Sequence, residues 1–270
     1  MRNRYKDGSF DVCSVEPLLI SNHLPLTDRG FRYGMALFET LRCVRGVAQF
    51  LPEHIERLTE SARLAGFPEI TLNEETFART LQEQELNGVA RIYLTAGDGA
   101  PDAPITEPRI AVLTETKSLA APQTCALTIH PDPHLPPFNG LKTANYWLNA
   151  DALTRSNAQG FDNALLFHPA GHLIGAATAN VFLKIDGKWQ TPSPDASARQ
   201  GIVRAWTLRH LEAWEVFISK PELELADAAF LTNSWLGVLP VTRIDSRTLS
   251  IPPEVPPLRD AFFKHVGEAS

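Results

Sequence analysis

Two hydrophobic periodicities alternate along this chain, one helical and the other typical of strands. From Leu51 onward, apolar residues recur every three or four positions, which predicts a helix that ends at Gly66. Pro52 suits the first turn of that helix, and Glu53 complements the positive end of its dipole. The same reasoning predicts further helices over 71–87, 149–157 and 201–214.

Strands are predicted where short apolar or β-branched runs end at turns. Residues 10–50 are rich in such runs, and the run 35–45 turns at Arg45-Gly46. Gly171 predicts a hairpin turn that joins a strand over 164–167 to one over 180–185. The remaining predicted strands are 90–95, 110–114, 125–130, 229–232 and 238–244, the last being the final strand of the chain. Because helices and strands are mixed without a regular βαβ alternation, the predicted fold class is α+β.

The stretch from Lys117 to Gln123 has the composition of a linker, with two alanines and Pro122. We therefore expect a small N-terminal domain over residues 1–116, a linker over 117–123 and a larger C-terminal domain over 124–270. A chain of 270 residues is long enough for two modest domains.

Composition excludes several classes of function. Charged residues make up 21% of the chain and the formal net charge is −6, so no broad basic surface is available for nucleic acid. No apolar run approaches the ~18 residues that a membrane span needs, and the polar N-terminus lacks a secretory hydrophobic region. Neither the three cysteines (Cys13, Cys43 and Cys125) nor the eight histidines have the spacing of a disulfide framework or a metal site. We expect a cytoplasmic protein without a metal.

Three segments carry candidate chemistry. Lys142 has apolar neighbours, and desolvation can lower the pKa of a lysine amine from ~10.4 to roughly 7–8. Arg57 lies on the first predicted helix and can hold a phosphate through two parallel hydrogen bonds. Gly201-Ile202 opens a helix, whose free N–H groups favour an anion. Taken singly, the three are equally compatible with a surface lysine, a solvated arginine and a plain helix start.

In their order along the chain, these segments resemble the class IV aminotransferases, the fold-type IV enzymes that use pyridoxal 5'-phosphate (PLP). That family includes branched-chain and D-amino-acid aminotransferases and aminodeoxychorismate lyase. The resemblance runs from about Asp28 to Val241 and is carried by Asp28-Arg29-Gly30, Tyr33-Gly34, Phe38-Glu39-Thr40, Glu53-His54, Arg57-Leu58, Lys142, Asn145-Tyr146, Asn180-Val181-Phe182, Thr191-Pro192, Gly201-Ile202, Arg204, Thr232-Asn233-Ser234 and Pro240-Val241. It implies a D-amino-acid aminotransferase-like fold with two α/β domains, and a homodimer whose active site lies between the domains and near the subunit interface.

The resemblance also implies residue roles. Lys142 matches the lysine that forms a Schiff base with PLP, and Arg57 matches the arginine on the cofactor phosphate. Tyr146 matches a tyrosine that reaches the phenolic oxygen of the cofactor. The candidate cofactor ligands are Arg57, Lys142, Tyr146, Gly201, Ile202, Val203 and Ser234, and the candidate substrate ligands are Tyr33 and Arg91. In branched-chain enzymes the position of Arg91 faces the substrate carboxylate.

Four positions depart from the family pattern. Gly175 stands where members usually carry a glutamate that pairs with the pyridine nitrogen and keeps it protonated, and no acid occurs over 173–179. Met35-Ala36 replaces an Asp-Gly pair, Val203 replaces a common threonine, and Ala96 replaces an arginine of several members. These departures bear on standard transamination more than on PLP binding.

The segment 232–241 resembles the aminodeoxychorismate lyase branch more than the transaminases. We therefore expect a lyase that converts 4-amino-4-deoxychorismate into 4-aminobenzoate and pyruvate, a step of folate biosynthesis. Two alternatives stay open. One is an aminotransferase acting on branched-chain or D-amino acids, and the other is a PLP-binding protein whose catalysis is impaired because Gly175 replaces the glutamate.

Overall fold

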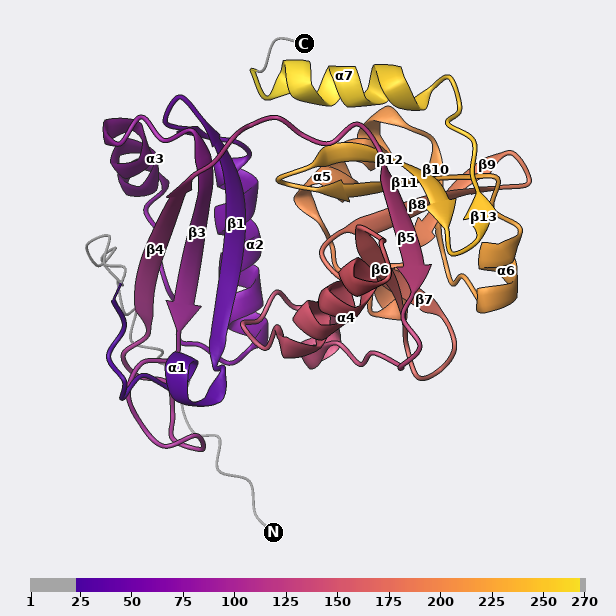
Figure 1. The fold of residues 1–270 in the computed structure, drawn as a ribbon. Coiled ribbons are helices and arrows are strands. Elements are labelled where there is room, and N and C mark those ends of the chain that lie inside the picture. The colour runs from indigo at the N-terminus through magenta and orange to yellow at the C-terminus, as the bar shows by residue number, and fades with distance from the viewer. Residues whose placement is uncertain (1–22, 268–270) are drawn as a thin grey trace.

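The computed structural model describes residues 23–267, so Cys13 and the two chain ends lie outside the described residues. Within that range the strands form two sheets, which stand side by side in Figure 1. One sheet has four strands in the order β2-β1-β3-β4. The other has nine, in the order β10-β9-β8-β11-β12-β5-β6-β7, with β13 paired to β12. This mixture of helices and sheets confirms the predicted α+β class.

The four-stranded sheet is antiparallel throughout. Its apolar face packs against α2, where Leu41 of β1 meets Ile55 and Leu58 in one buried cluster. This packing agrees with the helical spacing of the apolar residues after Leu51. The elements of this part are α1 (Arg29–Tyr33), β1 (Ala36–Val44), β2 (Val47–Ala48), α2 (Leu51–Leu64), α3 (Glu74–Glu83), β3 (Gly88–Thr95) and β4 (Arg109–Thr116).

The nine-stranded sheet is mixed, with parallel pairs β9-β10, β12-β5 and β5-β6. Its strands are β5 (Cys125–Ile129), β6 (Asn163–Phe167), β7 (Leu173–Ala176), β8 (Asn180–Ile185), β9 (Lys188–Pro192), β10 (Ala213–Val216), β11 (Ala228–Asn233), β12 (Gly237–Ile244) and β13 (Arg247–Thr248). Its helices are η1 (Pro137–Gly140), α4 (Trp147–Ala158), η2 (Pro194–Ala196), α5 (Ile202–His210), α6 (Lys220–Glu224) and α7 (Val255–His265).

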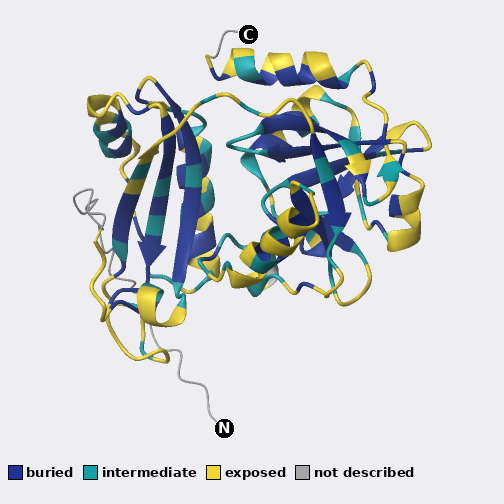
Figure 2. Ribbon diagram, viewed as in Figure 1, coloured by how far each residue is buried: buried dark blue, intermediate teal, exposed yellow. Residues whose placement is uncertain are grey.

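Alternation along the central strands gives this sheet two buried faces. On β8, Phe182 points to one cluster while its neighbours Val181 and Leu183 belong to another. The cluster that contains Phe182 also includes Trp206 of α5 and Phe262 of α7, so these two helices cover that face. Figure 2 shows the strands of both sheets as the most buried elements of the fold.

The segment 117–123, predicted as a linker, lies between the last strand of one sheet and the first strand of the other. Two arginines fix it by donating hydrogen bonds to its carbonyls. Arg42 of β1 bonds to Leu119 and also to the Trp235 carbonyl oxygen at 2.8 Å, while Arg259 of α7 bonds to Pro122 at 2.9 Å. The predicted division into two domains stays a prediction.

Three predictions about local structure are wrong. The helix predicted over 201–214 ends at His210, because the backbone becomes extended at Leu211 and Trp214 enters β10, which pairs with β9. The strand that pairs with β6 is β7, not 180–185, which pairs with β9 and β11 instead. Strand 238–244 is not final, since β13 and α7 follow it.

Glycines at two positions with left-handed backbone should respond differently to alanine. A Cβ at Gly97 (φ +66) would lie 2.0 Å from the Glu107 carbonyl oxygen, whereas at Gly66 (φ +79) nothing lies within 4 Å. We expect Gly66→Ala to lower the free energy of unfolding by about 1 kcal/mol through backbone strain alone. Gly97→Ala should cost a further ~1–3 kcal/mol because the backbone must move. Urea denaturation measures both, and equal losses would contradict the close approach at Gly97.

Candidate active site

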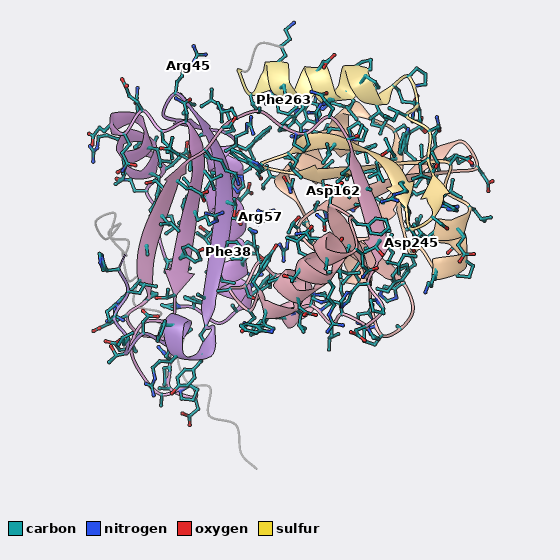
Figure 3. The ribbon with its side chains drawn as sticks, in the orientation of Figure 1. Phe38, Arg45, Arg57, Asp162, Asp245 and Phe263 are labelled. Atoms are coloured by element: carbon teal, nitrogen blue, oxygen red, sulfur yellow. The ribbon has the colours of Figure 1, made fainter. Side chains whose placement is uncertain are left out.

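A cavity of about 570 Å³ lies between the two sheets. One wall comes from β1, α2 and β3, through side chains such as Phe38, Arg57 and Arg91. Phe38 and Arg57 are labelled in Figure 3, on the side of the first sheet that faces the second. The opposite wall comes from β7, the start of α5 and the loop after β11. Of the described residues that line this cavity, none is an aspartate or a glutamate.

Lys142 is held in the cavity by the backbone of its own loop. Its carbonyl oxygen accepts a hydrogen bond of 2.9 Å from the Phe38 N–H, and the Ala144 N–H donates to the Ala36 oxygen at 2.8 Å. The loop therefore adds a short extended segment to the edge of β1. The Lys142 amine lies 3.8 Å from the centre of the Phe38 ring.

The surroundings of Lys142 favour a neutral amine. Burial lowers its pKa well below the usual value, and the positive charge of Arg199 lowers that pKa further. Glu39 opposes the shift, while Arg57 and Arg91 add to it. A neutral amine is the form of lysine that acts as a nucleophile or a base.

Arg57 belongs to a buried polar network. Its Nε and Nη2 donate to the two oxygens of Glu39 at 2.8 and 2.5 Å, and its Nη1 donates to the Gln200 carbonyl oxygen at 2.9 Å. His54 Nδ1 lies 2.7 Å from Glu39, and His54 Nε2 lies 3.2 Å from the Ser234 hydroxyl. The network thus connects β1, α2, the approach to α5 and the loop after β11.

The ionisation of this network follows from its charges. Burial raises the pKa of Glu39, but the charge of Arg57 and the hydrogen bonds of His54 and Arg57 outweigh burial, so the net pKa is lowered and Glu39 is a carboxylate. Burial lowers the pKa of His54. Because a carboxylate only accepts, His54 Nδ1 carries its proton, and Nε2 accepts from the Ser234 hydroxyl.

The start of α5 faces the same end of the cavity. Gly201 is the N-cap of this nine-residue helix, and a Cβ there would lie 2.0 Å from Asn180 Oδ1. Gly201 and Ile202 both line the cavity, and the Arg57 bond to Gln200 brings a guanidinium beside the helix start. Free N–H groups, a positive helix end and an arginine are together the kind of group that can bind a phosphate. Val203 has its side chain in the core, so only its backbone can contribute.

Tyr146 lines the cavity from the start of α4. Its hydroxyl donates to the Ala177 carbonyl oxygen at 3.2 Å, and its ring meets Phe38 edge-on with centroids 5.7 Å apart. Burial raises the pKa of Tyr146, so the hydroxyl keeps its proton, which would reach an oxygen in the cavity only by leaving Ala177. Tyr146, Lys142, Arg57 and the start of α5 line the same cavity, and their donor groups fit the chemistry of PLP.

The two candidate substrate ligands lie in different places. Arg91 lines the cavity from β3 and pairs with Glu115 at 3.2 Å. Tyr33 lies on α1, is 40% exposed and is not one of the residues that line this cavity. Its role in substrate binding stays a prediction.

Sequence reasoning missed several residues of the cavity, above all Arg199, with Lys117 and His134. Arg199 stands two positions before Gly201, and that short distance from the predicted phosphate site was the available signal. Glu39 and His54 belong to sequence motifs of the family resemblance, but the sequence assigns neither residue a role. The members of their network are far apart in the chain and meet only in the folded protein.

Residues 23–267 contain neither a candidate membrane span nor a candidate metal site. No helix there is long and apolar enough to cross a bilayer. No group of three or more histidine, cysteine, aspartate or glutamate side chains in that range is placed to hold a metal ion.

Comparison with known proteins gives the family. The model of the family described as "Amino-transferase class IV" matches residues 36–244, which is most of the chain. A probable branched-chain-amino-acid aminotransferase of Aquifex aeolicus is 28% identical, over 94% of this chain and 90% of its own length.

Solved structures agree. A putative 4-amino-4-deoxychorismate lyase of Legionella pneumophila has a TM-score of 0.84 at 26% identity, covering 93% of this chain and 98% of that chain. An aminotransferase of Brucella abortus, solved with PLP bound, has a TM-score of 0.79 at 24% identity, covering 90% of this chain and 93% of that chain. This chain therefore belongs to the class IV aminotransferase family of PLP-dependent enzymes.

Proposed function

We propose that this enzyme is an aminodeoxychorismate lyase, which converts 4-amino-4-deoxychorismate into 4-aminobenzoate and pyruvate. The observation that carries the proposal is the cavity wall, which combines aromatic rings with cations and, in its described part, contains no acid. The substrate is an unsaturated six-membered ring with two carboxylates and one amino group. Both the ring and the charges match that wall.

The aromatic part of the wall favours a ring-shaped substrate. Phe38 and Tyr93 stack with centroids 5.7 Å apart and an interplanar angle of 19°, and Tyr146 meets Phe38 edge-on. Trp235 lines the cavity from the loop after β11. Faces of this kind bind flat, unsaturated rings by stacking, whereas small aliphatic amino acids leave most of such a wall without contact.

The charged part of the wall favours carboxylates. Lys117 lies 5.2 Å from the centre of the Trp235 ring, so a cation and an aromatic face are presented together. Arg91 and His134 line the cavity as well. An arginine binds a carboxylate through two parallel hydrogen bonds, which fixes its orientation.

The comparisons support the lyase in part. The Legionella pneumophila structure, with its TM-score of 0.84, is a putative lyase of this kind. An aminodeoxychorismate lyase of Vibrio harveyi is 24% identical over 84% of this chain. The residues Trp235 and Leu236, which led to the lyase interpretation of the sequence, line the cavity.

When bound, PLP accepts electrons from the substrate carbon that loses a proton. The residues of this chain position both molecules and move that proton. Arg57 and the start of α5 would hold the phosphate. Ser234 would donate to the phosphate, and Tyr146 to the phenolic oxygen, only after their hydroxyls turn away from His54 and Ala177. The amine of Lys142, whose pKa is lowered by burial, would act as a neutral base in this cavity. It takes the proton from the substrate carbon and returns it at the leaving pyruvate.

The second candidate is an aminotransferase acting on branched-chain or D-amino acids. It is favoured by the 28% identity to the Aquifex aeolicus relative and by a D-alanine aminotransferase of Bacillus licheniformis that is 26% identical. An aminotransferase converts its cofactor to the amine form when an amino donor is added, and a keto acid reverses the change. Absorption spectra across a panel of donors detect this conversion.

We also propose that the enzyme is a cytoplasmic homodimer, as the family resemblance implies. Large apolar side chains are exposed around the lysine loop, with Phe138 64%, Trp147 86% and Leu148 55% exposed. Such a patch beside a cavity marks a surface that another chain covers. A second copy seated there would bring its own residues to the mouth of the cavity.

Product formation tests the lyase directly. Incubation of the PLP-loaded enzyme with 4-amino-4-deoxychorismate should release 4-aminobenzoate and pyruvate in equal amounts, measured by fluorescence and by a coupled pyruvate assay. Lys142→Ala removes the base and should lower the rate by about 10²–10⁴-fold. Absence of both products from the wild-type enzyme would overturn the proposal, and a full cycle of cofactor conversion by an amino donor would favour the aminotransferase.

Loss of Arg57 should weaken PLP binding. Arg57→Leu removes a charged hydrogen bond worth about 1.5–3 kcal/mol, so the dissociation constant of PLP should rise by roughly 10- to 100-fold. Spectroscopic titration of the apoenzyme measures it.

Arg63→Leu is the matched control, because Arg63 lies on the same helix but is exposed and pairs with Glu60 at 2.6 Å. Arg57→Lys keeps the charge beside buried Glu39 and serves if the leucine variant does not fold. Unchanged PLP affinity in the folded Arg57 variants, or an equal loss in the control, would contradict a phosphate role.

A further inference from the structure

Arg199 is a partly buried cation whose hydrogen-bonding capacity is not fully used. Its side chain lines the cavity, and its Nε is buried without a hydrogen-bond partner among the described residues. A buried N–H without an acceptor costs about 1–3 kcal/mol. Such a group is expected to meet an acceptor when the cavity is filled.

The chain itself offers Arg199 no carboxylate in the described part of the cavity wall. Glu39 is an acid whose charge acts on the pKa of Arg199. Both oxygens of Glu39 are already bonded, one to Arg57 Nε and the other to Arg57 Nη2 and His54 Nδ1. The missing acceptor must therefore come with a ligand.

The backbone at position 175 does not favour an added acid. Asn180, the first residue of β8, donates to the Arg199 carbonyl oxygen at 2.7 Å, which ties Arg199 to the wall that contains Gly175. Gly175 has a φ of +146, which side chains rarely adopt, and a Cβ there would lie 3.2 Å from the Ala179 carbonyl oxygen. The backbone at position 175 is thus built for glycine, and Arg199 is the charged side chain of this wall.

PLP brings three kinds of acceptor into the cavity: phosphate oxygens, a phenolic oxygen and a ring nitrogen. The phosphate already has Arg57, the start of α5 and Ser234, and the phenolic oxygen has Tyr146. The ring nitrogen is the acceptor for which these residues provide no hydrogen-bond donor. We propose that Arg199 donates a hydrogen bond to the ring nitrogen of PLP and thereby keeps that nitrogen unprotonated.

The chemical consequence follows from the guanidinium. It has only donors, and although burial lowers the pKa of Arg199 the guanidinium remains charged near neutral pH, so it has no lone pair to accept a hydrogen bond from a ring N–H. A ring nitrogen that accepts from Arg199 cannot also carry a proton. An unprotonated ring withdraws electrons less strongly from the substrate carbon.

This weaker withdrawal of electrons suits a lyase better than a transaminase. This part of the inference rests on the proposed function. Elimination of pyruvate leaves an aromatic ring, so the product itself stabilises the electrons that the cofactor accepts less well. Arg199 has a second effect in the same direction, because its charge lowers the pKa of Lys142 and keeps the base neutral. With Arg199 in place, the reaction therefore depends less on electron withdrawal by the PLP ring. It depends more on the neutral base Lys142 and on the aromatic product.

The test observes the ring nitrogen itself. The apoenzyme is loaded with PLP that carries an isotopic label on that nitrogen, and its magnetic resonance is followed with pH. In the wild-type enzyme the resonance should stay at the position of an unprotonated pyridine over the whole pH range in which the protein is folded. In Arg199→Leu it should move toward the protonated position as the pH falls.

Two matched variants complete the test. Arg91→Leu removes a different cation from the same cavity and should leave the resonance unchanged, while Arg199→Lys keeps a charged donor and should preserve the unprotonated position if Arg199→Leu fails to fold. A protonated nitrogen in the wild-type enzyme, or the same resonance in wild type and Arg199→Leu, would overturn the proposal. Because no turnover is measured, the result is separate from the lyase assay: an enzyme that lacks lyase activity can still show an unprotonated ring.

Discussion

The structure depends on burying the amine of Lys142 without a carboxylate beside it. A buried ammonium needs a counter-ion, and the described cavity wall provides none. The one acid close enough to raise the pKa of Lys142 is Glu39, whose oxygens are taken by Arg57 and His54. Burial and neighbouring arginines therefore act in the same direction, and the neutral form of the lysine is favoured.

The fold produces this arrangement by joining elements that are distant in the chain. The lysine loop adds to the edge of β1, so Lys142 is placed over Phe38 of the first sheet. The helix start and the loop after β11 approach from the second sheet. The cavity is lined by cations, and a phosphate or carboxylate bound there would supply negative charge.

Some of this could be predicted from the sequence. Lys142, Arg57 and Gly201 were found because their neighbours form short motifs whose order is specific, and the structure brings all three to one cavity. Arg199 has no such motif, since its importance comes from a buried Nε without a partner. The contact of His54 with Ser234 joins residues 180 positions apart, which no local pattern reports. The helix predicted over 201–214 is longer than the observed one because Trp214 lies in β10. Pairing of β10 with β9 is a long-range contact that overrides helical propensity there.

The most direct test of this account is the titration of Lys142 in the apoenzyme. Lysines labelled with a carbon isotope next to the amine are followed by magnetic resonance as the pH is raised, and Lys142→Met identifies the signal of Lys142 by its loss. The account predicts that Lys142 titrates well below the usual lysine value of ~10.4, apart from the other lysines. A Lys142 signal that titrates together with the exposed lysines would contradict it.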